Sequence, residues 1–142
     1  MWLSSTLHNA LNLTGRQKKL VLTVFWLSIY RNILLFRGDK AGFTENICKN
    51  QDSTVELTAD KILISKDISL AIGIVNKYLP WKNVCRHQSW QAVRLLLKHQ
   101  IPFKYSVGMH KTNKIKEGHS WVKVNDKFVC GRCDEKEFFI IY

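Results

Sequence analysis

The stretch from residue 79 to 97, LPWKNVCRHQSWQAVRLLL, places the strongest constraint on the fold of this chain. Pro80 ends the element before it, because the residue preceding a proline avoids the helical conformation. From Cys85 onward, small and apolar residues recur at helical spacing, so Cys85 opens one face of an amphipathic helix. A helix N-terminus offers unpaired backbone N–H groups and a partial positive charge, which favour a thiolate. The stretch therefore predicts either a nucleophilic cysteine or a buried structural one.

A second pattern, over residues 118–124, predicts a strand. The sequence GHSWVKV mixes polar and apolar residues in alternation, Asn125-Asp126 reads as a turn, and residues 128–130 continue beyond it. These features predict a β-hairpin with His119 near the start of its first strand. A cysteine that opens a helix and a histidine on a later strand occur in this order in papain-like and transglutaminase-like thiol enzymes.

The order and separation of several short motifs carry a more specific resemblance. The C-terminal part of the chain, roughly residues 66–130, resembles the lasso-peptide leader peptidases, the transglutaminase-like family that includes the microcin-processing B protein. The matching motifs are Pro80-Trp81, Cys85 with Gln88 three residues on, Gln100-Ile101-Pro102, Val107-Gly108-Met109 and His119-Ser120-Trp121-Val122-Lys123-Val124.

This resemblance implies an α+β fold, in which a papain/transglutaminase-like unit packs its cysteine helix on a small antiparallel sheet. We expect residues 1–60 to form an N-terminal helical segment and linker, and residues 61–142 to form the peptidase domain. The implied activity is that of a cysteine protease that removes the leader from a ribosomally made lasso-peptide precursor. The implied partners are that precursor, a separate leader-recognition protein and an ATP-dependent lasso cyclase. The cysteine chemistry requires no metal or cofactor.

Peptide hydrolysis by a thiol needs a nucleophile, a proton carrier and donors for the oxyanion. We expect Cys85 to be the nucleophile and His119 the general base and then the general acid. His87 and His99 are alternatives close to Cys85 in sequence, but the strand setting and the HSWVKV match both favour His119. We also expect Gln88 and, next to the histidine, Trp121 to contact the substrate.

The third catalytic group departs from the family pattern. The resembling family has an aspartate twelve residues after the histidine, and this chain has Gly131 there. Asp134 is the nearest carboxylate, and it reaches His119 only if the chain bulges, which a glycine permits. We therefore expect Asp134 to complete the site, with a backbone carbonyl or a water as the alternative. A second hypothesis follows from the missing aspartate: a non-catalytic adaptor that binds the precursor or an anionic surface.

The remaining cysteines form no recognised site. Cys130 and Cys133 make a C-x-x-C pair, which invites a zinc or redox interpretation, but a second ligand pair with the usual spacing is missing. Cys48 lies in no motif. Four cysteines and no secretory signal favour a reducing cytoplasm.

The chain is strongly basic, with 22 Lys+Arg against 11 Asp+Glu and a net charge of +11. Such a balance suggests an acidic partner. The basic residues are scattered without a run of five or more, so we expect no nucleic-acid binding.

Residues 16–36 form the most apolar segment, and Thr14 is a suitable N-cap for a helix over them. The uninterrupted apolar part, about eleven residues, is shorter than the ~20 needed to span a bilayer. A buried or docking helix is therefore favoured, and basic residues at both ends leave contact with a membrane surface as the less favoured alternative.

The other segments give shorter signals. Residues 1–14 predict a short helix or loose arm, and residues 38–54 a linker with one short helix around Glu45. Residues 55–65 predict a strand or connector, followed by a helix that starts after Ser65 or Asp67. Strands are predicted at 103–108 and 137–142. A basic loop is predicted at 110–118, and because it leads into His119 it could overhang the expected catalytic groove.

Overall fold

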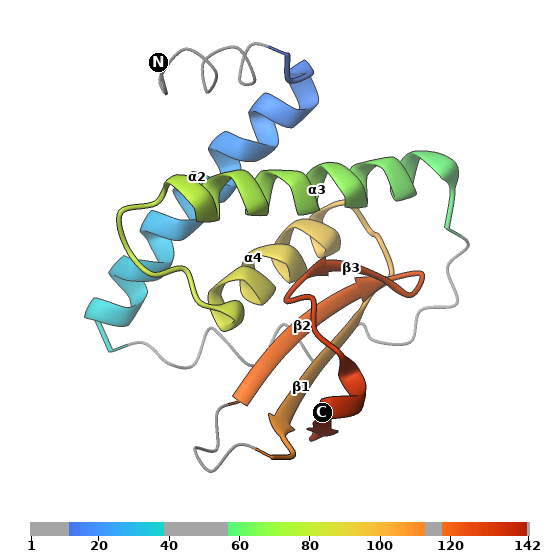
Figure 1. The fold of residues 1–142 in the computed structure, drawn as a ribbon. Helices are drawn as coiled ribbons and strands as arrows, with labels where there is room; N and C mark the ends of the chain where they lie inside the picture. The colour runs from blue at the N-terminus through green and yellow to red at the C-terminus, as the bar shows by residue number, and fades with distance from the viewer. Residues whose placement is uncertain (1–11, 39–56, 113–117, 142) are drawn as a thin grey trace, which may run out of the picture.

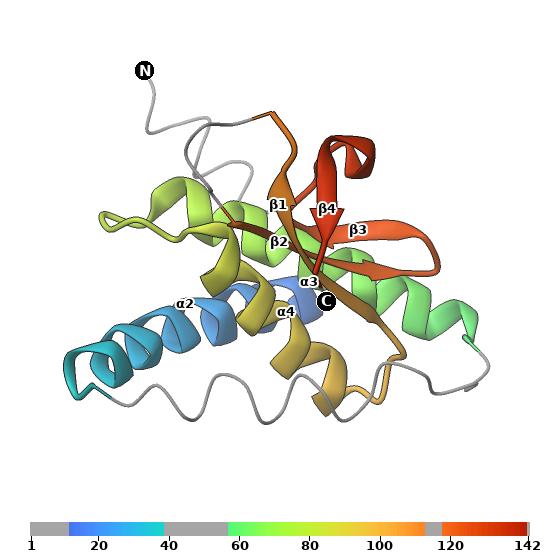
Figure 2. The same cartoon turned by 90° about the horizontal axis from the view of Figure 1, so that it is seen from below.

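The computed structural model describes residues 12–38, 57–112 and 118–141. Helices α3 and α4 pack on a four-stranded antiparallel sheet, and α2 packs on α3 and α4, which confirms the predicted α+β class (Figures 1 and 2). The elements are α2 Gly15–Phe36, α3 Ala59–Tyr78, α4 Cys85–Lys98, β1 Lys104–His110, β2 Gly118–Val124, β3 Lys127–Cys130, the 3₁₀ turn η2 Glu135–Glu137, and β4 Phe138–Ile140.

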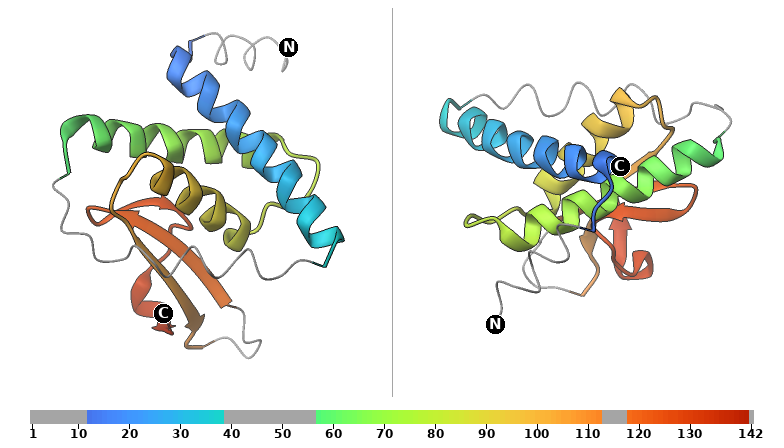
Figure 3. Two further views of the ribbon diagram at one scale, coloured as in Figure 1. Left: turned by 180° about the vertical axis from the view of Figure 1, so that it is seen from behind. Right: turned by 90° about the horizontal axis from the view of Figure 1, so that it is seen from above.

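Helix α2 begins where the sequence predicted. The Thr14 side chain accepts from the Gln17 N–H, and the Gln17 side chain accepts from the Thr14 N–H, which completes a capping box. The helix ends at its C-cap Arg37, and Gly38 follows with φ of 71°, a conformation that glycine adopts without strain. The left view of Figure 3 shows α2 crossing α3 diagonally.

Helix α3 corrects the prediction for residues 55–65. The described part of that segment is helical from Ala59, because the Thr58 side chain accepts from the Lys61 N–H and Asp60 lies in the first turn. The expected domain boundary near residue 60 therefore falls inside the first turn of α3. The helix buries one apolar face, which consists of Ile68, Ala71, Ile72 and Val75.

The hairpin of β2 and β3 matches the prediction closely. Asn125 and Asp126 have φ of 47° and 60°, so both central residues of the turn are left-handed, as a type I′ hairpin turn requires. Val124 pairs with Lys127 across this turn. The register shifts between Val122 and Lys123, so β3 contains a bulge opposite these residues.

The sheet has the order β3-β2-β1-β4, so the chain's last strand lies beside β1. The predicted strands at 103–108 and 137–142 correspond to β1 and β4. The inner side of the sheet joins the helices in one core, in which Leu96, Val122 and Val24 of α2 are completely buried. The predicted arm, the helix around Glu45 and Cys48 lie outside the described residues.

Candidate active site

Cys85 is the first residue of α4, and its side chain is half-buried. The N-cap residue is Val84, which has no polar side chain and makes no capping hydrogen bond. The Val84 carbonyl accepts from the N–H groups of His87 and Gln88, which closes the first turn. The free backbone N–H groups at this end of α4, beside the Cys85 thiol, are therefore not occupied by a capping side chain.

The loop before Cys85 is fixed by side-chain hydrogen bonds. Gln88 Nε2 donates to the Asn83 carbonyl over 2.7 Å, and Asn83 Nδ2 donates to Gln91 Oε1 over 3.3 Å. Trp81 Nε1 donates to Ser28 Oγ of α2 over 2.9 Å. Gln88, which we expected to contact the substrate, is therefore engaged in holding the loop that presents Cys85.

Helix α4 is joined to β2 by a pair of buried serines. Ser89 Oγ lies 3.1 Å from Ser120 Oγ, within hydrogen-bond distance. Cys85 lies one helical turn before Ser89 on the same face of α4, and His119 directly precedes Ser120 on β2. Because α4 and β2 run side by side in the same direction (Figure 1), Cys85 and His119 lie at the same end of these two elements. Successive side chains alternate along a strand, so the His119 ring lies with Trp121 on the face of β2 opposite Ser120.

The His119 ring has a defined hydrogen-bond partner on one side. Its Nε2 lies 2.9 Å from the carbonyl oxygen of Gly131. A carbonyl can only accept, so Nε2 carries the proton and the neutral ring has its lone pair on Nδ1. The ring also stacks on Trp121 and lies against Phe138, with centroid distances of 6.0 and 5.5 Å. These contacts fix the ring plane and leave Nδ1 as the basic nitrogen.

Gly131 occupies the position where the resembling family has an aspartate. Its φ is +69°, and a Cβ there would collide with the carbonyl oxygen of Ser120 and lie 2.9 Å from the Trp121 Cα. The close approach brings the Gly131 carbonyl to His119, so a main-chain oxygen holds the imidazole. This is the alternative that the sequence left open.

Asp134 differs from its predicted role as the third catalytic group. Its Oδ1 accepts from the Lys136 N–H over 3.1 Å and so caps η2. The carboxylate lines the same hollow as His119. The ring nitrogen, however, is bonded to the Gly131 carbonyl and not to Asp134. The register shift lies within β3, and Gly131 follows the end of that strand in the left-handed conformation. Its backbone carbonyl, and not the Asp134 carboxylate, thus comes to the imidazole.

Trp121 is completely buried, which argues against the expected contact with substrate. Its Nε1 donates to Glu135 Oε1 over 2.7 Å, and Lys123 Nζ donates to Glu135 Oε2 over 2.8 Å. The Lys123 hydrogen bond is the largest cause that lowers the pKa of Glu135 below its usual value. Sequence reasoning missed this group, although the i, i+2 spacing of Trp121 and Lys123 places them on one face of β2.

The competing histidines are less suitable. Burial lowers the pKa of His87, and the charges of Arg31 and Arg86 lower it further. His99 is the C-cap of α4, at the opposite end of the helix from Cys85, and burial also lowers its pKa. His119 therefore stays the preferred base.

The two cysteines of the C-x-x-C pair lie in different environments: Cys130 is in the core and Cys133 is near the surface. Burial raises the pKa of Cys130 to about 12, so this thiol stays protonated, and its Sγ lies 3.7 Å from Ser89 Oγ. Cys133 is half-buried and faces the surface grooves. Within the described ranges, no three His, Cys, Asp or Glu side chains form a group suited to a metal ion.

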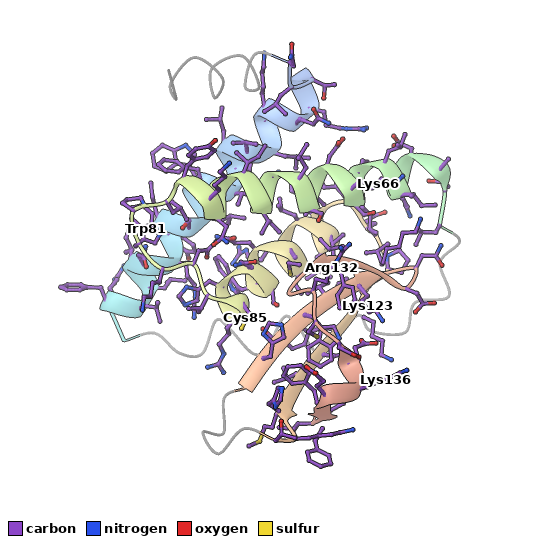
Figure 4. All side chains as sticks on the ribbon, in the orientation of Figure 1. Lys66, Trp81, Cys85, Lys123, Arg132 and Lys136 are labelled. Atoms are coloured by element: carbon purple, nitrogen blue, oxygen red, sulfur yellow. The ribbon has the colours of Figure 1, made fainter. Side chains whose placement is uncertain are left out.

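Two surface hollows adjoin each other directly after the end of β3. One, of about 290 Å³, is lined by His119, Asp134 and Phe138 among others. The other, of about 640 Å³, lies between α3 and the β2–β3 hairpin and carries the basic side chains of Lys66, Lys127 and Arg132. Arg132 and Cys133 line both, so the hollows form a continuous surface, which we call the basic groove; Figure 4 labels Lys66 and Arg132.

Comparison with known proteins agrees with this arrangement of helix, strand and thiol. The family model of the transglutaminase-like superfamily matches residues 32–142. No curated protein and no solved structure matches the chain. The chain belongs to the transglutaminase-like superfamily, whose fold includes cysteine peptidases and transglutaminases.

Proposed function

We propose that this protein is a cysteine peptidase that removes the leader peptide from a lasso-peptide precursor. Two observations carry the enzymatic part: a thiol stands at an uncapped helix N-terminus, and an imidazole on the neighbouring strand β2 is held through Nε2 by a main-chain carbonyl. The leader and the lasso precursor come from the resemblance in the motifs around Cys85 and His119.

The site supports a two-step acyl transfer. His119 Nδ1 takes the thiol proton, and the Cys85 sulfur attacks the carbonyl carbon of the scissile peptide bond. The oxyanion that forms is stabilised by N–H groups at the N-terminus of α4. The imidazolium then gives its proton to the leaving amine, and a thioester remains. Water, deprotonated by His119, hydrolyses the thioester and frees the leader acid and the thiol.

The basic groove supports recognition of an acidic segment of the precursor. Lys66, Lys127 and Arg132 line its larger hollow, where Asp126 is the acidic lining residue, and Asp134 and Glu137 line its smaller hollow. No ion pair neutralises these three cations among the described residues. In the proposed pathway a separate leader-recognition protein delivers the precursor, and an ATP-dependent cyclase uses the product.

The test is cleavage of a lasso precursor by the purified protein, with and without a leader-recognition protein, followed by mass spectrometry. The wild type should release the intact leader, and Cys85→Ala should not. Cys48→Ala is the control, because this cysteine lies in no motif of the sequence. Cleavage by Cys85→Ala at the wild-type rate refutes the thiol mechanism.

The second candidate is a non-catalytic adaptor of the same fold, and one observation favours it. Among the residues that the structure describes, the His119 ring is hydrogen-bonded to the Gly131 carbonyl and to no carboxylate. An adaptor would bind the precursor but leave it uncut. Binding of the precursor without cleavage, by wild type and Cys85→Ala alike, would support this candidate.

A further inference from the structure

Helix α2 buries polar residues and exposes apolar ones. The residues buried on its inner face include Ser28 and Arg31 beside Leu20 and Val24. On the opposite side, large apolar side chains recur at i, i+3, i+4, i+7, i+11 and i+14, which places them on one face. This outer stripe consists of Leu22, Phe25, Trp26, Ile29, Ile33 and Phe36.

The exposure of the outer stripe is large and continuous. Trp26 is 65% exposed and Phe36 is 95% exposed. An apolar hollow of about 410 Å³ lies along its C-terminal half, lined by Ile29, Ile33, Phe36, Asn32 and Trp81. Contiguous apolar surface of this kind marks a site of interaction in soluble proteins.

The charged residues of α2 and its C-cap all have one sign. Lys18 and Lys19 precede the outer stripe and Arg37 follows it, and α2 contains no acidic residue. Arg16, one turn earlier, is paired with Asp67 at 2.7 Å and with Asp60 at 3.3 Å. In the described part of the chain, Lys18, Lys19 and Arg37 form no ion pair. These cations are thus available to an anionic partner at both ends of the stripe.

Charge decides between the possible occupants of this face. If two copies packed through their α2 helices, either orientation would bring lysine or arginine of one copy against lysine or arginine of the other. An anionic bilayer surface neutralises both ends at once and accepts the apolar side chains between them. Aromatic Trp26 suits the boundary between headgroups and acyl chains.

The same helix is long and apolar enough to cross a membrane when judged by length and composition alone. Its packing excludes that arrangement in the folded protein, because the inner face contacts α3 and α4 and buries the charged Arg31. A helix that is docked on one side and apolar on the other can lie flat in a membrane interface. We propose that the outer stripe of α2 binds the surface of an anionic lipid bilayer.

This inference does not depend on the catalytic proposal. Residues 15–31, most of α2, lie outside the superfamily match. One of the contacts between α2 and the matched residues reaches the candidate site: Trp81, which lines the apolar hollow and bonds to Ser28, belongs to the loop that leads to Cys85. Bound lipid would lie against this loop.

Flotation of the purified protein with vesicles tests the proposal. Vesicles of phosphatidylcholine mixed with phosphatidylglycerol should bind it, and binding should weaken with salt. Trp26→Ser/Ile33→Ser should lower the partition coefficient at least about tenfold, since two apolar side chains leave the bilayer. Leu63→Ser/Leu70→Ser on α3 is the matched control, because these leucines are 51% and 42% exposed and should leave binding unchanged.

The cationic contribution is tested separately. Lys18→Gln/Lys19→Gln should weaken binding about twenty- to thirtyfold, at about fivefold per charge next to the surface. Lys127→Gln/Lys136→Gln removes the same charge from the start of β3 and from η2, and should have a much smaller effect. All variants should first show wild-type circular dichroism and thermal midpoint.

Three results would overturn the proposal. The first is no binding of the wild type to anionic vesicles at low salt. The second is an equal loss of binding in the α2 variants and in their controls. The third is a dimer without lipid that dissociates on Trp26→Ser/Ile33→Ser, which would make the face a self-association surface.

Discussion

Alanine at Gly131 and alanine at Gly73 should change stability in opposite directions. Gly131 has φ of +69°, and a Cβ there would collide with the Ser120 carbonyl oxygen. Gly73 lies inside α3, and a Cβ there would meet no atom within 4 Å. The two variants carry the same chemical change, so each is the control for the other.

The magnitudes follow from these two environments. An L-residue in the left-handed region costs about 1–2 kcal/mol, and relieving the collision with Ser120 adds about 1–3 kcal/mol. Gly131→Ala should therefore lower the free energy of unfolding by about 2–5 kcal/mol. Gly73→Ala should raise it by about 0.5–1 kcal/mol, because glycine in a helix interior is less stable than alanine by this amount.

Urea denaturation followed by tryptophan fluorescence measures both values, with the m-value checked for constancy. In the cleavage assay, Gly131→Ala should also lose turnover, because movement of its carbonyl releases the His119 ring. Gly73→Ala should cleave normally. If Gly131→Ala is as stable as the wild type, then residue 131 does not adopt the left-handed conformation. The carbonyl would then not be placed at His119 as described.

Asp134→Asn should keep most of the cleavage rate, since its carboxylate bonds to the Lys136 N–H and not to His119; a loss of orders of magnitude in turnover would restore the triad with Asp134. The pKa of Glu135 is lower in the folded protein than in the unfolded chain, so the ionised carboxylate stabilises the fold. This stabilisation is fully present above the pKa of the unfolded chain and is lost as the pH falls through the pKa of the folded protein. Between about pH 6 and about pH 3, the free energy of unfolding of Glu135→Gln should therefore decrease less than that of the wild type, and parallel curves would contradict this. Peptide mapping after iodoacetamide treatment at neutral pH should find Cys85 modified and Cys130 unmodified, because the Cys130 pKa is about 12; labelled Cys130 in folded protein would show that its burial is wrong.

The sequence was sufficient where a short stretch determines its own structure. Thr14 and Gln17 cap α2, Cys85 opens α4 after a proline-containing loop, and Asn125-Asp126 form the turn that their left-handed tendency predicts. These features depend on neighbours within four residues, so they could be read without knowing the rest of the chain.

The sequence was insufficient where the outcome depends on segments far apart. The hydrogen bond from His119 to the Gly131 carbonyl requires the bulge in β3 and the close approach to Ser120, and a main-chain acceptor leaves no signal in residue type. The sequence also could not show which face of α2 is buried, because apolar residues line both of its faces. Only the packing of α3 and α4 decides that Ser28 and Arg31 turn inward.

The central claim is that Cys85 and His119 act as a pair, and the rate of Cys85 alkylation tests it most directly. The second-order rate constant for iodoacetamide should be measured by mass spectrometry from about pH 5 to about pH 9 in wild type and His119→Gln. The account predicts that the wild type reacts faster near neutral pH and that its pH profile shifts upward when His119 is replaced. Superimposable profiles for the two proteins would contradict the pairing, and with it the proposed thiol mechanism.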